Sequence, residues 1–129
     1  MFSALLRIVG VIQIVLGVAY LFVPAEFLRL IGHSAPAADL LYPLGMLAAR
    51  FIAYGLGFLW ISRSPDAHRP WIALMVLIQA IDLGVGAYYT ATGVVPLALS
   101  AFPMFNAVWI ALGLVAMLLR KDDAREART

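Results

Sequence analysis

The segment from Leu41 to Arg63 reads LYPLGMLAARFIAYGLGFLWISR and places one arginine, Arg50, near the middle of an otherwise apolar run. A guanidinium is not deprotonated in proteins, so within lipid it needs a partner, a water-filled cavity or a route to the headgroups. The carboxylate that lies deepest in another apolar run is Asp82. The segment therefore predicts a membrane-spanning helix whose arginine constrains what surrounds it.

The composition is typical of a chain solvated by lipid. Hydrophobic residues make up 64% of the 129 residues and charged residues 12%, and the mean hydropathy is +0.98. Soluble domains have roughly 45–50% apolar and about 25% charged residues. The net charge of +2 arises from few, scattered basic residues, so nucleic acid is not expected as a partner and these residues become signals of topology.

The apolar runs predict one domain, an all-α, up-and-down bundle of four membrane-spanning helices. At ~1.5 Å per residue each run is long enough to cross a ~30 Å hydrocarbon core. The segment 25–31 is amphipathic and is expected to lie in the membrane interface, ending at Gly32. The expected spans cover residues 2–23, 41–63, 71–90 and 97–119, and a charged tail covers 120–129.

The basic residues near the span ends predict the orientation. With this number of spans, the N-terminus, the connection between the second and third spans and the C-terminus share one side. That side holds Arg7, Arg63, Arg69, Arg120, Lys121, Arg125 and Arg128, whereas the other side holds Arg29. Because cytoplasmic ends of spans are enriched in Lys and Arg, both termini are expected to be cytoplasmic.

Polar residues from different spans are expected at one depth. Measured from the outer helix ends at the helical rise, Arg50 lies about 10 Å deep and Asp82 about 12 Å. The same count gives about 15 Å for Gln13, 16 Å for Gln79 and 13 Å for Asn106. We therefore predict a shared polar layer in the interior, with Arg50 paired to Asp82.

Helical spacing indicates which faces carry this layer. The expected inward stripes are Gly10, Gln13, Gly17 and Tyr20; Arg50, Tyr54 and Gly57; Gln79, Asp82 and Gly86; and Asn106 and Gly113. Small residues beside polar ones allow membrane helices to approach closely. The candidate residues are thus Arg50, Asp82, Gln13, Gln79, Asn106 and Tyr54.

The polar layer has two interpretations, and its central pair has an alternative. The layer is either a clasp between helices that fixes their register or a site for a small molecule or a proton. Instead of pairing, the Arg50 side chain can reach the outer headgroups along the helix surface, with Asp82 protonated. The residue types do not decide between these possibilities.

Several kinds of chemistry are disfavoured. The chain has no cysteine, so thiol catalysis, disulfides and cysteine metal sites are absent. The histidines, His33 and His68, are expected on opposite sides of the membrane and cannot share a metal. With no catalytic motif, metal site or cofactor expected, an enzyme is the less favoured class.

One set of motifs resembles a known family. Arg7 opens a helix that contains Gly10 and Gly17, and Phe22-Val23-Pro24-Ala25-Glu26-Phe27 follows, with Gly32 before a proline-containing loop. This pattern, over mainly the first half of the chain, resembles the DoxX-like small bacterial membrane proteins. The resemblance implies four spans, cytoplasmic termini, the bacterial inner membrane and an accessory or quinone-linked role. Such proteins often carry an acidic residue in the second span, where this chain has Arg50.

The favoured function is a non-catalytic accessory subunit or binding protein whose polar layer holds a lipophilic small molecule. The alternatives are a transporter of small molecules, linked to protons through Asp82, and a small membrane enzyme. An adjacent Arg50 would lower the pKa of Asp82, which argues against acid–base catalysis. The expected partners are membrane lipids, copies of the chain or a larger membrane complex, and a lipophilic small molecule.

The predicted pair can be tested by exchanging its charges. If Arg50 and Asp82 form a clasp, Arg50→Gln and Asp82→Asn should each lower the yield of assembled protein, because a charge at mid-bilayer without its partner costs about 2.5–3.5 kcal/mol. The double variant Arg50→Asp/Asp82→Arg should restore much of that yield. Size-exclusion chromatography in mild detergent measures it, and single variants that assemble normally would contradict the clasp.

Overall fold

The computed structural model describes residues 2–126, and the side chains of residues 2–119. Four helical segments are long and apolar enough to cross a membrane. These segments are Phe2–Phe22, Ala38–Ile61, Pro65–Ala91 and Leu97–Leu119. The structure confirms an all-α, multi-pass membrane protein, while the cytoplasmic location of its termini stays a prediction.

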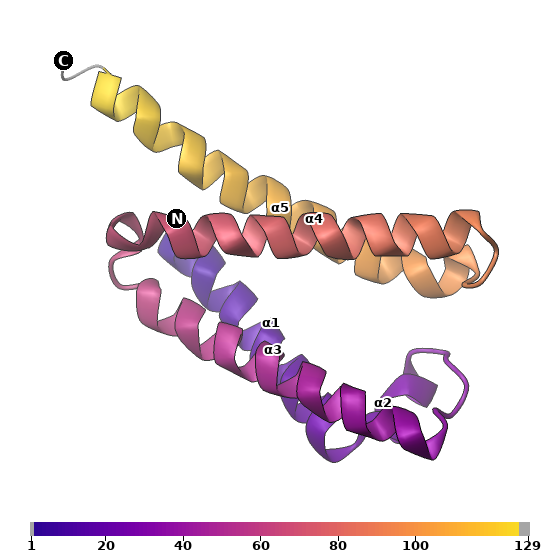
Figure 1. Ribbon diagram of the computed structural model, residues 1–129. Coiled ribbons are helices and arrows are strands. Elements are labelled where there is room, and N and C mark those ends of the chain that lie inside the picture. The colour runs from indigo at the N-terminus through magenta and orange to yellow at the C-terminus, as the bar shows by residue number, and fades with distance from the viewer. Residues whose placement is uncertain (1, 127–129) are drawn as a thin grey trace. The chain divides into compact units, whose positions relative to one another are not determined.

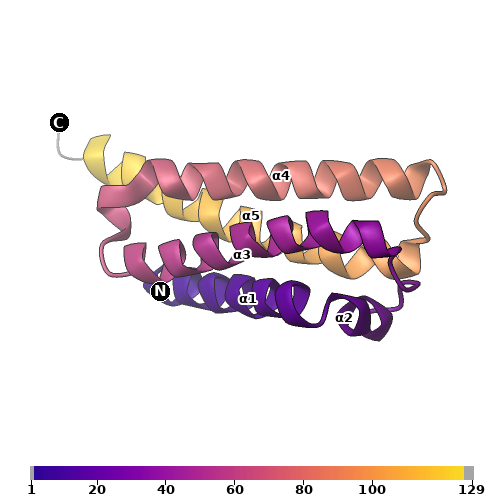
Figure 2. The same ribbon diagram turned by 60° about the horizontal axis from the view of Figure 1, so that its bottom comes forward.

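The chain divides into two compact units, one that extends to Pro65 and one that begins at Asp66. In the first unit α1 (Phe2–Phe22) packs against α3 (Leu41–Ile61), and in the second α4 (Arg69–Ala91) packs against α5 (Leu97–Glu126). Figures 1 and 2 show the two helices of each pair side by side and antiparallel. The antiparallel pairing agrees with the expected up-and-down order of the helices. That residues 1–119 form a single domain stays a prediction.

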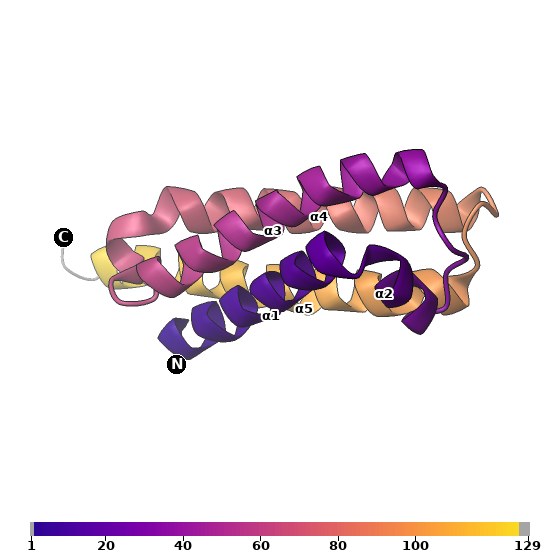
Figure 3. The same cartoon turned by 90° about the horizontal axis from the view of Figure 1, so that it is seen from below.

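A proline separates the first span from the short helix that follows it. Val23 has φ −137°, outside the helical region, and Pro24 opens α2 (Pro24–Leu30). Proline suits the first turn of a helix because it has no N–H to leave unpaired there. Figure 3 shows α2 following directly on the end of α1. A turn of 3-10 helix, Ala38–Leu40, then leads into α3.

Two helices end at glycines in the left-handed region. Gly32 has φ 92° and Gly93 has φ 75°. After α2 the N–H of Gly32 donates to Arg29 O at 3.0 Å and that of His33 to Leu28 O at 2.9 Å. This pair of bonds is the Schellman termination, which glycine favours because it has no Cβ. The helix that begins at Pro24 therefore ends just before Gly32, while the interfacial location of the segment 25–31 stays a prediction.

The helices of the first unit make backbone contact at glycines. A Cβ added to Gly55 would lie 2.7 Å from the carbonyl oxygen of Gly10, and one added to Gly10 would lie 2.9 Å from that of Gly55. A Cβ on Gly17 would meet the carbonyl oxygen of Ala48 at 3.0 Å. Gly10 and Gly17 are buried together with Gln13, so this stripe faces inward as its spacing predicts. On α3 the contact falls at Gly55.

The second unit packs through larger side chains. Gly86 of α4 faces Met104 of α5, whose Cγ lies 2.7 Å from the position of an added Cβ. Buried side chains on the two helices include Ile72, Met75, Ile110 and Leu114. Helix α5 contains Pro103 and continues to Glu126, so the charged segment after the last span begins as helix. The final residues of the expected tail lie outside the described part of the chain.

The glycine contact between α1 and α3 leads to a stability prediction. Gly55→Ala should lower the free energy of unfolding by about 1–3 kcal/mol, the usual cost of overpacking, because the added methyl meets a backbone oxygen that cannot rotate away. Thermal unfolding of the purified protein in detergent measures this change.

Gly45→Ala is the matched control, because Gly45 lies in the same helix and nothing stands within 4 Å of its added Cβ. This control should be neutral or stabilising by up to about 1 kcal/mol, since alanine favours helix over glycine. Equal unfolding temperatures for the two variants would show that the backbones are farther apart than described.

Candidate functional site

Gln13 is a buried polar side chain near the middle of α1 in the first unit. It lies on the buried face of α1 between Gly10 and Gly17 and is 5% exposed. Its amide carries two donors and a carbonyl oxygen. The amide of Gln13 makes no hydrogen bond with the described residues, and its polar atoms are not fully enclosed by them. It therefore has unused hydrogen-bonding capacity within an apolar span.

Gln79 holds a similar position in the second unit. It is 3% exposed on α4, and its Nε2 donates to Met75 Sδ, one turn earlier, at 3.3 Å. A thioether is a weak acceptor. The Oε1 atom accepts no hydrogen bond from residues 2–119, so this amide is also only partly used.

Arg50 lies on an exposed part of α3. Its Nη1 donates to the carbonyl oxygen of Met46, four residues earlier, at 3.3 Å. This bond directs the guanidinium toward the beginning of α3, where Tyr42 and Pro43 lie. That is the direction expected for a side chain that reaches toward the headgroups. Tyr54, one turn later, is half-buried.

The remaining candidates lie in the second unit. Asp82 is exposed on α4, one turn after the buried Gln79. Asn106 is half-buried on α5, and its Oδ1 accepts a hydrogen bond from Trp109 Nε1 at 2.9 Å. The carbonyl oxygen of Asn106 is thus engaged within its own helix.

Within each unit, the described candidates form no hydrogen bond with one another. Gln13, Arg50 and Tyr54 belong to the first unit, and Gln79, Asp82 and Asn106 to the second. Because Arg50 and Asp82 lie in different units, their pairing stays a prediction. What each unit shows by itself is a glutamine amide, buried in an apolar helix, that can bind a further polar group.

Several polar contacts between helices were not anticipated. Arg7 Nε of α1 donates to Ser62 Oγ at the end of α3, at 3.3 Å. In the second unit Arg69 Nη2 donates to the carbonyl oxygen of Leu118 at 2.9 Å. The hydroxyls of Thr90 and Ser100 share a hydrogen bond of 2.7 Å. Each contact includes one residue at or next to a helix end, namely Ser62, Arg69 and Thr90. For the last contact, the available signal in the sequence was a hydroxyl-bearing residue on each side of the turn from Thr92 to Pro96.

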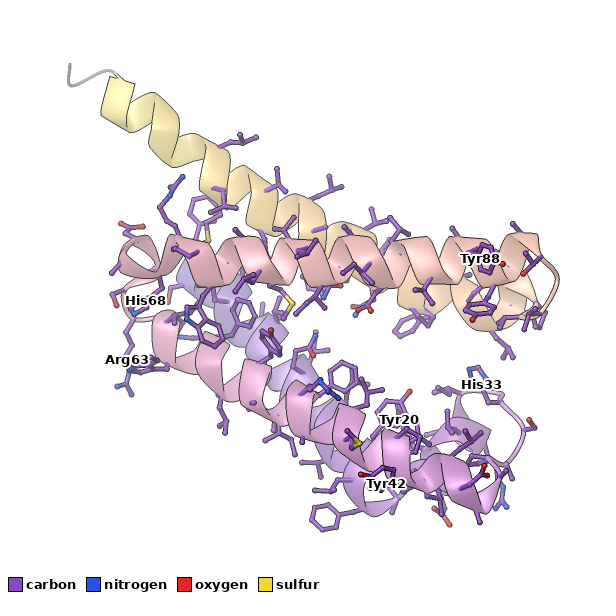
Figure 4. All side chains as sticks on the ribbon, in the orientation of Figure 1. Tyr20, His33, Tyr42, Arg63, His68 and Tyr88 are labelled. Atoms are coloured by element: carbon purple, nitrogen blue, oxygen red, sulfur yellow. The ribbon has the colours of Figure 1, made fainter. Side chains whose placement is uncertain are left out.

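An aromatic cluster joins three helices of the first unit. The ring of Tyr20 on α1 lies edge-on to Phe27 of α2, with centroids 5.1 Å apart, and stacks on Phe51 of α3 at 5.9 Å. Figure 4 shows Tyr20 at the same end of this unit as His33 and Tyr42, and Arg63 at the opposite end. The rings fix α2 beside the end of α1.

Comparison with known proteins does not place the chain in a family. No family model, curated protein or solved structure matches the chain. What the fold defines is a small four-pass membrane protein, and the resemblance to the DoxX-like family stays a prediction.

The Thr90–Ser100 contact can be tested by removing one hydroxyl. Thr90→Val should lower the free energy of unfolding by about 0.6 kcal/mol, the mean for hydrogen bonds between membrane helices. Thr92→Val is the matched control, because the Thr92 hydroxyl donates only to carbonyl oxygens of its own helix, those of Tyr88 and Tyr89. Unfolding titrations in mixed micelles should separate the two variants. A loss as large for Thr92→Val would assign the effect to the helix end and not to the contact.

Proposed function

We propose that this multi-pass membrane protein is a non-catalytic binding protein or accessory subunit, which holds a lipophilic small molecule against a buried amide. The observation that carries the proposal is Gln13, an amide 5% exposed on an apolar helix with no hydrogen bond to the described residues. Because its polar atoms are not fully enclosed by the described residues, within a span they face lipid, where a polar group without a partner costs about 1–3 kcal/mol. A bound molecule that hydrogen-bonds Gln13 would remove this cost.

Gln79 supports the same kind of ligand. Its one hydrogen bond to the described residues is to the sulfur of Met75, and methionine is a flexible side chain that adapts to irregular apolar shapes. An amide oxygen beside a methionine suits a ligand with an apolar body and a hydroxyl or N–H group. The proposed ligand therefore partitions into lipid and carries a small number of hydrogen-bonding groups.

The amides argue for binding without chemistry. A glutamine side chain neither takes up nor releases a proton in the working pH range, so it orients a ligand and does not act as a general acid or base. An accessory subunit needs no more than this, because it presents or stores a lipophilic compound for a neighbouring protein in the same membrane.

A transporter is the second candidate, and Asp82 favours it. The carboxyl group is exposed on α4 one turn beyond Gln79, and an ionisable side chain within a span commonly marks a path for protons or substrates. In this alternative Asp82 takes up a proton while the ligand is bound near Gln79.

The experiment that tests the proposal compares Gln13→Leu with the native protein. After extraction in mild detergent, mass spectrometry of the organic extract should identify a lipophilic compound that co-purifies with the native protein. Gln13→Leu should bind it about 2–10-fold more weakly, as expected for one lost hydrogen bond. The ligand-free variant should be at least as stable as the native protein, because an amide without a partner has been replaced by an apolar group.

Val11→Leu is the matched control, since Val11 is exposed on the same helix and should leave the bound compound unchanged. A Gln13→Leu protein that keeps the compound and unfolds more easily would contradict the proposal, because Gln13 would then be a structural clasp. The transporter is tested by measuring uptake of the same compound into proteoliposomes that contain the Asp82→Asn variant. If this variant still binds the compound but no longer takes it up, the transporter is favoured over the binding protein.

A further inference from the structure

The first unit concentrates positive charge at one end. Arg7 near the start of α1 and Arg63 after the end of α3 lie at this end, as the contact between Arg7 and Ser62 shows. The carboxylates of residues 2–65 are Glu26 in α2 and Asp39 in the 3-10 turn before α3. Both lie toward the other end of the two helices. Within the described first unit, the two guanidinium groups therefore have no carboxylate beside them. The next carboxylate along the chain is Asp66, three residues after Arg63, and Arg63 forms no ion pair with it.

The guanidinium of Arg7 is held in a fixed orientation. Its Nε donates to Ser62 Oγ at 3.3 Å, and that hydroxyl donates to the carbonyl oxygen of Leu59 at 2.8 Å. Ser62 is 2% exposed, so its position is set by packing. The Nη groups of Arg7 form no hydrogen bond with residues 2–119. An arginine anchored through Nε presents these groups as a fork that matches the oxygens of a phosphate.

Arg63 follows Ser62 directly and supplies a second cation. It is exposed, Figure 4 shows it at the end of the first unit, and its side chain makes no hydrogen bond with the described residues. Neighbouring residues in a chain are about 3.8 Å apart at Cα. The guanidinium of Arg7, bound at the Ser62 hydroxyl, and the long side chain of Arg63, which starts from the next residue, can therefore reach one tetrahedral anion.

At the end of the first unit that holds Arg7 and Arg63, the membrane can supply such an anion as the phosphate of a lipid headgroup. Trp60, in the last turn of α3, is 66% exposed, and exposed tryptophans near span ends lie at the headgroup region. Arg7 lies about 8 Å along α1 from its beginning, still within the apolar run, so its charge has to extend toward the headgroups. Basic pockets between membrane helices are known to bind lipid phosphates.

We propose that Arg7 and Arg63, with Ser62 holding the first of them, form a binding site for the phosphate of an anionic phospholipid. The site is separate from the buried amides and does not depend on the proposed function. It differs from a simple topology anchor because it requires the Arg7 fork in a fixed orientation, whereas a topology anchor requires only positive charge.

The test measures lipid binding by the full chain. Native mass spectrometry of the purified protein, titrated with phosphatidylglycerol and with phosphatidylcholine of the same acyl chains, should show at least fivefold tighter binding of the anionic lipid. Arg63→Gln should reduce this affinity about fivefold, the contribution of one basic residue at a membrane surface. Arg29→Gln is the matched control at the other end of the unit, on α2, and should bind as the native protein does.

Two further variants separate a built site from bulk charge. Arg7→Lys keeps the charge and loses the fork, and Ser62→Ala keeps both charges and frees Arg7. Each should weaken phosphatidylglycerol binding at least twofold, and inorganic phosphate at the same concentration should not displace the lipid. Because Arg63 has no hydrogen bond to the described residues, Arg63→Gln should fold even if the Arg7 variants do not. Unchanged lipid affinity in Arg63→Gln, or an equal loss in Arg29→Gln, would overturn the proposal, as would displacement by inorganic phosphate.

Discussion

The first unit depends on the contact between the backbones of α1 and α3 at Gly10 and Gly55. In lipid there is no hydrophobic gain from bringing two apolar helices together, so van der Waals contact and hydrogen bonds between helices must stabilise the pair. Backbones that touch bring the flanking side chains within range of many weak attractions. The Arg7–Ser62 bond and the ring contacts of Tyr20 both need this approach, which fixes the register of one helix on the other.

Features set by local chemistry could be predicted from the sequence. The apolar runs define the spans, Pro24 and Gly32 define the short helix between them, and helical spacing places Gly10, Gln13 and Gly17 on one face. The choice of Gly55 over Gly57 as the contact with α1 could not be predicted. Both are small residues in the same turns of α3, and the choice depends on the shape of the opposing helix.

The candidate polar residues show a different limit. The sequence gives the depth of a Cα atom, but a long side chain can carry its charge away from that depth, as Arg50 does by bonding to Met46 O toward the beginning of α3. Short side chains cannot, so Gln13 and Gln79 remain where their backbones put them. The role of Ser62 was not predicted, because the candidates were polar residues near mid-membrane depth and Ser62 lies at a helix end. There it is buried and makes two hydrogen bonds, one with Arg7 and one with Leu59 O.

The length of α5 has a mechanical consequence. Its 30 residues make a rod of about 45 Å, whereas the hydrocarbon core is about 30 Å thick, so roughly 15 Å of rod stands clear of the core. Because an unbroken helix transmits tilt along its axis, a change in the tilt of the span moves this projecting part with it. The bond from Arg69 to the carbonyl oxygen of Leu118 joins the first turn of α4 to α5 where the apolar span of α5 ends, so the two helices are tied together at the base of the projecting part.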